Sequence, residues 1–183
     1  MLSLYPLTAP IPVLSTARLV LREHRFADLA AFTAIFQKPE FYAFLGGQPL
    51  PEEEVWTKVL RNNGHWSLLG FGYWAVEETA TGRYIGAVGF ADWRRDMAPS
   101  LKGEPEIGWV LDPAIHGLGY ATEAVQAALA WGQEHFSCSR TVCIIDPDNT
   151  ASLRVAAKHG YQPVAETIYK EKPIIVLARP QQR

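Results

Sequence analysis

Two glycines, Gly117 and Gly119, stand two residues apart immediately before a segment with helical periodicity. The first N–H groups of a helix lack intrahelical partners and carry the positive end of the helix dipole. A loop without side chains at these positions could bring several N–H groups up to a pyrophosphate. A plain glycine-rich turn would produce the same residues, so the segment by itself leaves both interpretations open.

The loop differs from two common phosphate-binding motifs. Its sequence, GLGYAT, lacks the Gly-Lys-Ser/Thr ending of a Walker loop and the third glycine of a dinucleotide fingerprint. Residues 112–116 also separate the first glycine from the preceding predicted strand, whereas the fingerprint follows its strand directly. We therefore do not expect a nicotinamide or flavin site.

The elements that would position this loop follow from hydrophobic periodicity and turn residues. Strands are predicted over residues 18–22, 72–78, 84–93, 106–111 and 140–145, with at least one more in the tail 168–177. Helices are predicted from a cap at Asp28 to before Pro39, after Pro51 through Leu60, from the glycine loop to about Phe136, and over 151–159. The order is β-α-α-β-β-β-α-β-α-β-β.

One strand–helix–strand unit, residues 106–145, requires a parallel pair of strands, whereas the hairpins around it are antiparallel. We therefore predict an α/β (α+β) domain with a mixed, mostly antiparallel sheet and helices on both faces. The chain of 183 residues suits one domain, 1–183, with an extended, proline-rich lead over 1–13.

Composition excludes several classes of function. The 17 basic and 19 acidic residues give a net charge of −2, which offers no electrostatic footprint for nucleic acid. No apolar run approaches the roughly 18 residues of a membrane span, and the start of the chain makes a poor signal peptide, so we expect a cytoplasmic protein. Cys138 and Cys143 do not form a Cys-x-x-Cys pair, the histidines include no i, i+4 pair, and no metal is expected.

The glycine loop, read from His116 to Ala121, resembles the acyl-CoA signature of the GNAT N-acetyltransferases, Gln/Arg-x-x-Gly-x-Gly/Ala. His116 departs from the usual Gln or Arg. Residues 16–22, 106–110 and 149–152 are similar, in the right order, to segments of the branch that acetylates ribosomal-protein N-termini. The resemblance spans about residues 14–178.

This resemblance implies that the strands 106–111 and 140–145 splay apart and that acetyl-CoA lies in the gap. Gly108 would then form a bulge. The implied cosubstrate-binding residues are Trp109, Val110, Leu111, His116, Gly117, Leu118, Gly119, Tyr120, Ala121, Asn149 and Ser152.

Acetyl transfer to an amine requires a base, a stabilised oxyanion and a proton for the leaving thiolate. Glu106, next to the expected thioester, is the first candidate for the base, directly or through water. An exposed strand glutamate or the partner of an arginine are its alternatives. Glu104 is the reserve candidate, and a strand N–H near Val110 could hold the oxyanion.

The proton donor is less evident. Many relatives place a tyrosine seven residues after the Asn of the last helix, where this chain has Ala156. Ser152 resembles the serine that replaces it in the ribosomal branch, and a helix-start serine bonded to the backbone is the alternative. Asn149 could be a helix cap, a pantetheine contact or both.

The resemblance implies an acetyl-CoA-dependent N-acetyltransferase whose acceptor is a peptide or protein N-terminal α-amine. A polyamine, amino sugar or amino acid acceptor and a non-catalytic acyl-CoA-binding module are alternatives, and both a monomer and a homodimer remain open. Residues 41–47 could be an acceptor lid or core. Arg94 and Arg95 could be a solvated turn, or could meet CoA or an acidic acceptor.

Overall fold

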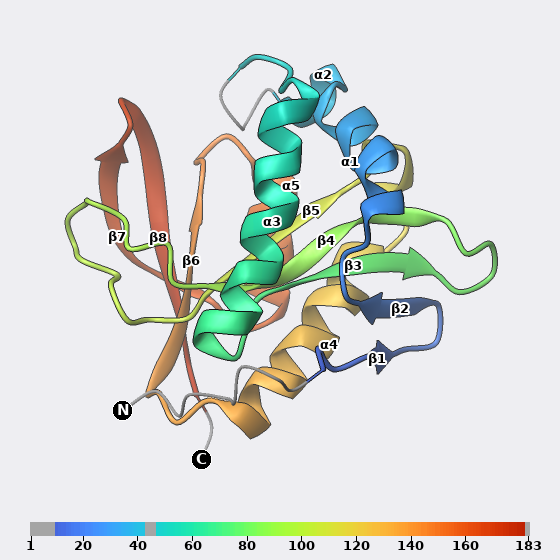
Figure 1. The fold of residues 1–183 in the computed structure, drawn as a ribbon. Coiled ribbons are helices and arrows are strands. Elements are labelled where there is room, and N and C mark those ends of the chain that lie inside the picture. Colours follow the sequence, from blue (N-terminus) through green and yellow to red (C-terminus); the bar gives the residue numbers. More distant parts are fainter. Residues whose placement is uncertain (1–9, 43–46, 182–183) are drawn as a thin grey trace.

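Eight strands form one sheet in the computed structural model, which describes residues 10–42 and 47–181 (Figure 1). Their spatial order is β1 (Leu14–Ser15), β2 (Leu19–Arg22), β3 (Tyr73–Glu78), β4 (Tyr84–Ala91), β5 (Glu106–Leu111), β6 (Arg140–Ile145), β8 (Lys172–Pro180) and β7 (Gln162–Tyr169). Every neighbouring pair is antiparallel except β5 and β6. The predicted mixed sheet with one parallel pair is confirmed.

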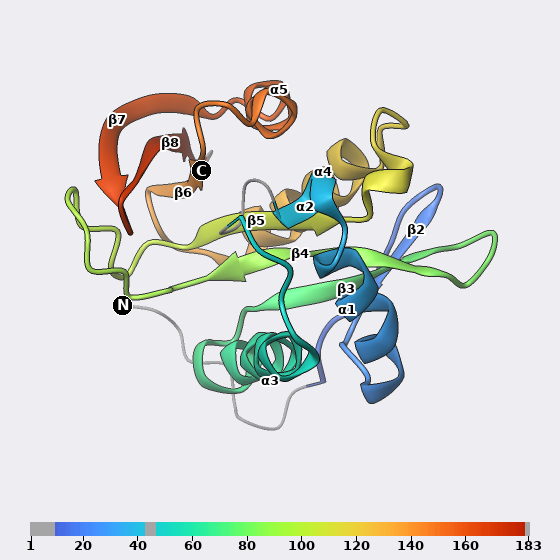
Figure 2. The ribbon, with the colours of Figure 1, turned by 90° about the horizontal axis from the view of Figure 1, so that it is seen from above.

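Helices cover both faces of the sheet, as predicted. They are α1 (Leu29–Phe36), α2 (Pro39–Tyr42), α3 (Glu52–Leu69), α4 (Tyr120–His135) and α5 (Thr150–Lys158), with short 3₁₀ turns at Phe26–Asp28 and Pro113–Ile115. Figure 2 shows α1 and α3 on one side of the central strands and α4 on the other. No helix within the described ranges is long and apolar enough to cross a bilayer.

Several element ends differ from the prediction. α3 continues past Leu60 to Leu69 because its buried stripe continues through Asn62 and Trp66, and it ends at Gly70, whose φ of 74° is left-handed. α2 and β1 were not predicted because four and two residues are too short for a periodic pattern. The lead expected over 1–13 lies mostly outside the described residues.

Asp28 does not cap α1, so that detail of the prediction is wrong. Its carboxylate accepts two hydrogen bonds from the guanidinium of Arg22, both 2.8 Å, and one from the backbone N–H of Arg25. The side chains of Arg22 and Asp28 are only 8% and 5% exposed. A buried arginine requires a carboxylate partner, and this requirement outweighs the local cap.

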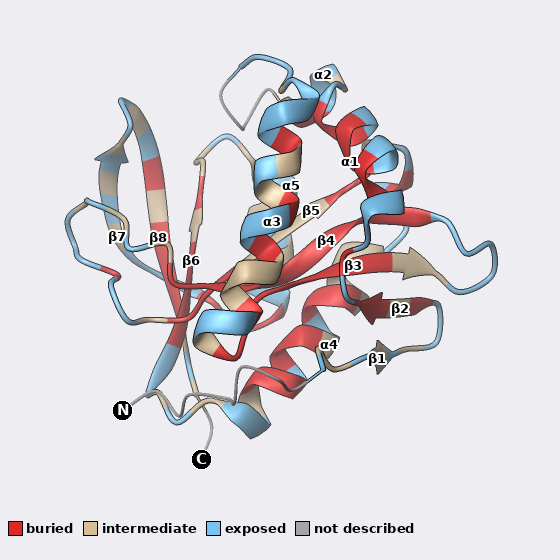
Figure 3. Cartoon of the chain, in the orientation of Figure 1, coloured by how far each residue is buried: buried red, intermediate tan, exposed pale blue. Residues whose placement is uncertain are grey.

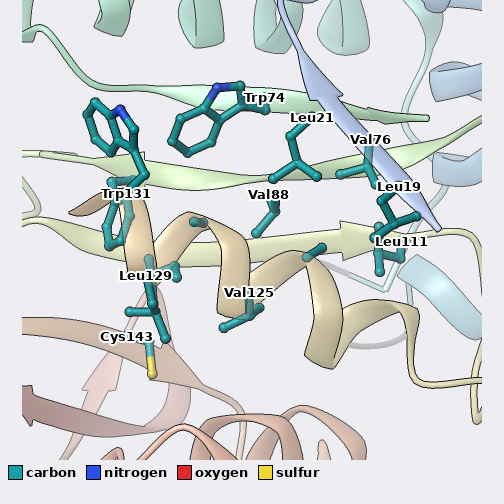
Figure 4. Close-up of a cluster of buried hydrophobic side chains, with 14 of the residues drawn as sticks. Leu19, Leu21, Trp74, Val76, Val88, Leu111, Val125, Leu129, Trp131 and Cys143 are labelled. Carbon is teal, nitrogen blue, oxygen red and sulfur yellow. The ribbon is translucent and has the colours of Figure 1, made fainter. Parts of the chain in front are cut away.

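The two largest hydrophobic clusters pack helices against the sheet, and Figure 3 shows buried residues along the central strands and on α1, α3 and α4. The larger one packs α4 against the sheet, and Figure 4 shows Trp131 of α4 beside Trp74, with Leu129 of α4 beside Cys143. Of the apolar positions predicted to share one face of α4, residues 125, 128, 129 and 132 are buried, and 121 and 136 are partly buried. The second core packs α1 and α3 against the other face.

His24 gives the fold a dependence on pH. The ring is 3% exposed, its Nε2 lies 3.2 Å from the Asn62 amide nitrogen, and burial lowers its pKa from 6.5 to about 4. The unfolded chain therefore takes up a proton near pH 6.5, and the folded protein does so only near pH 4. The free energy of unfolding should fall by up to about 3 kcal/mol as the pH drops through this window.

Urea unfolding measured between pH 7 and pH 4 checks this expectation, with His24→Gln as the matched variant. Glutamine does not titrate, and its oxygen can accept the Asn62 N–H. The variant should lose less stability than the wild type over the same range. Equal losses in the two proteins would show that other groups carry the pH dependence.

Candidate active site

The central feature of the site is the separation of β5 from β6. The two strands share one register pair, Glu106 with Val142, and the Val142 N–H donates to the Pro105 carbonyl at 3.1 Å. Beyond this point they diverge (Figure 1). Over Trp109, Val110 and Leu111, β5 therefore has a backbone edge that no strand of the described residues covers. The predicted splay is confirmed.

Gly108 does not form the expected bulge. The register between β4 and β5 is uninterrupted, and Gly108 stands opposite Gly89. The glycine makes room for another group instead, because a Cβ at this position would lie 2.1 Å from the hydroxyl oxygen of Tyr73. Burial, and then the charge of Glu106, raise the pKa of Tyr73, so its hydroxyl keeps its proton and can donate a hydrogen bond.

Glu106 lies where the strands separate and is 6% exposed. Both of its carboxylate oxygens accept hydrogen bonds from Arg95, at 2.8 and 2.7 Å. Each oxygen keeps a second lone-pair direction for another donor. Sequence analysis left an arginine partner open for Glu106, and the structure identifies it as Arg95. Glu104, the reserve candidate, forms a separate ion pair with Arg140 at 2.6 and 2.7 Å.

The glycine loop has a conformation that side chains disfavour. Gly117 and Gly119 have φ values of 79° and 83°, and Gly119 is the N-cap of α4. The first backbone bond of the helix runs from the Glu123 N–H to the Gly119 carbonyl at 3.1 Å. Among the described residues, the N–H groups of 120–122 therefore have no backbone acceptor, as an anion site requires.

Arg18 braces this loop, which sequence analysis did not foresee. Its guanidinium donates to Glu123 at 2.7 Å and to the Leu118 carbonyl at 3.0 Å, and it lies 4.3 Å above the centre of the Tyr120 ring. The Tyr120 hydroxyl donates in turn to Glu78 at 2.6 Å. The start of α4 is thereby fixed to β2 and β3, through contacts between residues 42 to 105 positions apart that no local pattern signals.

His116 occupies the position where the acyl-CoA signature has Gln or Arg. Its side chain is exposed, and its Nε2 lies 3.3 Å from the Leu111 carbonyl oxygen. The ring therefore contacts the backbone at the end of β5. This contact is compatible with a loop that offers mainly backbone groups to an anion.

The start of α5 lies across the gap from β5. Asn149 is the N-cap, and its side-chain oxygen accepts the Ser152 N–H at 3.0 Å, so the cap interpretation holds. Within the described part of the chain, the half-buried Ser152 hydroxyl makes no hydrogen bond and is available to another group. Ala156, where relatives have tyrosine, is fully buried in the core.

Other residues considered from sequence do not join this site. Cys143 is 1% exposed, and burial raises the pKa of its thiol well above the usual range, as expected of a core cysteine. In residues 10–42 and 47–181 no group of three or more His, Cys, Asp or Glu is placed to hold a metal. Of the segment 41–47, Phe41 packs on Phe36 in the core, and 43–46 lie outside the described residues.

The contact between Tyr73 and Gly108 can be tested by overpacking. Gly108→Ala should destabilise the protein by about 1–3 kcal/mol, because the new methyl group must displace a buried ring. The penalty should be smaller in a Tyr73→Phe background, since the nearest ring carbon would lie 3.3 Å from the Cβ once the hydroxyl is removed.

Urea unfolding of the two single variants and the double variant measures this coupling. Gly64→Ala, in α3 with open space around its Cβ, is the control and should be neutral or stabilising. Additive penalties at positions 73 and 108 would contradict the contact.

Comparisons with known proteins agree with this geometry. Residues 18–162 match the family model of the acetyltransferase (GNAT) domain. The chain is 30% identical over 171 residues to YkkB, an uncharacterized protein of Bacillus subtilis, covering 91% of this chain and 94% of that protein. A putative GNAT-family acetyltransferase from Bordetella pertussis has a TM-score of 0.81 at 28% identity, over 92% of this chain and 99% of its own.

A third comparison concerns the fold alone. RimL, a ribosomal-protein α-N-acetyltransferase solved in complex with coenzyme A, has a TM-score of 0.73 at 18% identity, over 92% of this chain and 98% of its own. The family model covers most of the chain, including the glycine loop and both splayed strands. This chain therefore belongs to the GNAT acetyltransferase family and is an N-acetyltransferase.

Proposed function

We propose that this enzyme transfers the acetyl group of acetyl-CoA to the α-amine of a peptide or protein N-terminus. One observation carries the proposal. β5 and β6 part after a single register pair, with the carboxylate of Glu106 at that point and the glycine loop beyond the far end of β5. A long thioester bound along the open edge would present its acyl group beside that carboxylate.

The described residues fit such a cosubstrate. The pyrophosphate is assigned to the loop from His116 to Ala121, whose free N–H groups and left-handed glycines suit an anion. The pantetheine amides would bond the uncovered backbone of β5 over residues 109–111. Asn149 and Ser152 stand on the other side of the gap, at the start of α5.

The reaction then needs only groups already in place. The neutral amine attacks the thioester carbonyl carbon, the new C–N bond forms, and the C–S bond breaks as CoA leaves. Glu106 accepts the proton of the amine, directly or through water, on a lone pair that Arg95 does not use. Ser152 supplies a proton to the leaving thiolate, and a β5 N–H near Val110 stabilises the oxyanion.

The α-amine is assigned on acid–base grounds. At pH 7 roughly a tenth of an α-amine with a pKa near 7.7–8.0 is neutral, against well under a thousandth of a lysine side chain with a pKa near 10.4. Glu106 carries the carboxylate at the point where β5 and β6 separate. Both of its oxygens already accept hydrogen bonds from Arg95. Such a site suits an amine that needs little help with deprotonation.

Variants separate the assigned roles. Glu106→Gln and Ser152→Ala should each lower kcat by about 10²–10⁴-fold, the usual contribution of a positioned base or acid, with little change in acetyl-CoA affinity. Gly119→Val should do the opposite and weaken acetyl-CoA binding, because its side chain fills the space of the pyrophosphate. Calorimetry and steady-state kinetics on the same preparations measure both quantities.

Gly160→Val is the control for backbone strain. Gly160 has a φ of 80° and open space around its Cβ, so valine there is strained as at Gly119 but away from the loop. Its acetyl-CoA affinity should stay near that of the wild type. Full turnover by Glu106→Gln or Ser152→Ala would remove that residue from the mechanism, and unchanged affinity in Gly119→Val would remove the loop from the cosubstrate site.

An acceptor panel tests the amine class. Short peptides with free N-termini should release CoA thiol from acetyl-CoA faster than N-acetylated peptides carrying a lysine, a polyamine or an aminoglycoside. Release that depends on the acceptor also distinguishes an enzyme from a module that only binds acyl-CoA. Rapid turnover of the polyamine or the aminoglycoside with inert peptides would overturn the α-amine assignment.

A further inference from the structure

Cations and aromatic rings from three separate parts of the chain meet beside Glu106. We call this group the basic aromatic cluster; its members are Lys58, Arg61, Trp93, Arg95, Tyr169 and Lys170. Lys58 and Arg61 come from α3, and Trp93 and Arg95 follow β4. Tyr169 is the last residue of β7, and Lys170 follows it in the turn to β8. No sequence pattern connects these three segments.

The two rings of the cluster contact three of its four cations, whereas the Lys58 Nζ lies 5.3 Å from the centre of the Phe36 ring. The guanidinium carbons of Arg61 and Arg95 lie 4.3 and 5.8 Å from the centre of the Trp93 ring. Arg95 also lies 5.0 Å from the centre of the Tyr169 ring, and the Lys170 Nζ lies 5.7 Å from the same ring. The positive charges are therefore gathered on one surface rather than spread along the chain.

This surface lacks the anions that would neutralise it. Within the described part of the chain, Arg95 has Glu106 as an ion-pair partner, whereas Lys58, Arg61 and Lys170 have none within 4.0 Å. Burial, then the charge of Arg61, lower the pKa of Lys58, although Glu54 opposes this shift. The positive charges of the cluster therefore repel one another, although the chain as a whole has a net charge of −2.

The cluster lies on the acceptor side of the proposed reaction. Arg95 binds Glu106 directly, and the Tyr73 ring, whose hydroxyl contacts Gly108, lies 5.9 Å from the Trp93 ring. An amine that donates its proton to Glu106 must therefore place its neighbouring atoms near these cations. Mutual repulsion of the cations is relieved when an anion binds, which favours an acidic substrate over a neutral or cationic one.

We propose that the acceptor of this enzyme carries a carboxylate a few bonds from its amine, and that Arg61 binds it with support from Lys58 and Lys170. This inference rests on the proposed acetyl transfer to an α-amine. It restricts that class to acceptors with an acidic residue next to the N-terminus, or to small α-amines with their own carboxylate. Trp93 holds the Arg61 guanidinium in place, and Arg95 stays with Glu106.

Matched acceptors test the charge without changing the amine. The first pair consists of two peptide amides, one with Glu and one with Gln at the second position. The second pair consists of a dipeptide with a free C-terminal carboxylate and the amide of the same dipeptide. The carboxylate member of at least one pair should have a kcat/KM about tenfold higher or more, as charge-assisted hydrogen bonds imply. The pair that shows the larger ratio identifies the source of the carboxylate.

Arg61→Met is the diagnostic variant, because methionine can still pack on Trp93 but carries no charge. It should bring the ratio close to one through a higher KM for the carboxylate acceptor. The kcat/KM for the neutral acceptor should change much less than that for the carboxylate acceptor, and acetyl-CoA affinity should stay near that of the wild type. Lys158→Met, which removes an exposed charge at the end of α5, should keep the wild-type ratio, and added salt should reduce that ratio.

Two results would overturn the inference while leaving acetyl transfer intact: equal kcat/KM values within both pairs, or a ratio that survives Arg61→Met. Failure of the proposed function has a different signature, the absence of turnover with all four acceptors. Calorimetric binding of the N-acetylated Glu and Gln peptides to the CoA-bound enzyme then decides independently. The carboxylate subsite is supported if the Glu peptide binds more tightly than the Gln peptide and if Arg61→Met removes this difference. Equal binding of the two peptides to the wild type refutes it.

Discussion

The site depends on one interruption of backbone hydrogen bonding. β5 and β6 form a parallel pair at Glu106 and Val142 and then separate, although unpaired strand edges are costly inside a protein. The separation holds because each strand is secured on its other side, β5 by the regular ladder with β4 and β6 by the ladder with β8. The uncovered edge is then available to the amides of a cosubstrate.

Ion pairs fix the positions of several charged side chains, and each pair holds a different part of the structure. Arg18 and Glu123 secure the glycine loop, Arg22 and Asp28 secure the start of α1, and Arg95 holds Glu106. Glu106 thus stays at one position on the wall of the gap. Lys58, Arg61 and Lys170 have no ion-pair partner within 4.0 Å among the described residues, and we propose that an acceptor carboxylate binds there.

Much of the local structure could be predicted from the sequence. The bounds of β5 and β6 match the prediction because short segments rich in β-branched and other apolar residues lie between turn residues. The position of the glycine loop could be predicted because two closely spaced glycines before a helix indicate either a tight turn or an anion site. Prediction failed for Asp28 and Gly108, where a tertiary contact decided the outcome: the Arg22 guanidinium of β2 binds the Asp28 carboxylate, and the Tyr73 hydroxyl occupies the space beside Gly108.

The sequence by itself determined the order of the elements, the class of fold and the position of the loop, because these features depend on neighbours in the chain, on periodicity and on turn chemistry. The candidates Glu106, Asn149 and Ser152 came from the resemblance of their segments to a known family. The tertiary structure alone decided that Arg95 binds Glu106, that Arg18 braces the loop, and that α3, the end of β4 and the end of β7 bring their cations to one surface. Such contacts join residues from 11 to 100 positions apart, and only packing of the whole sheet sets the distances between them.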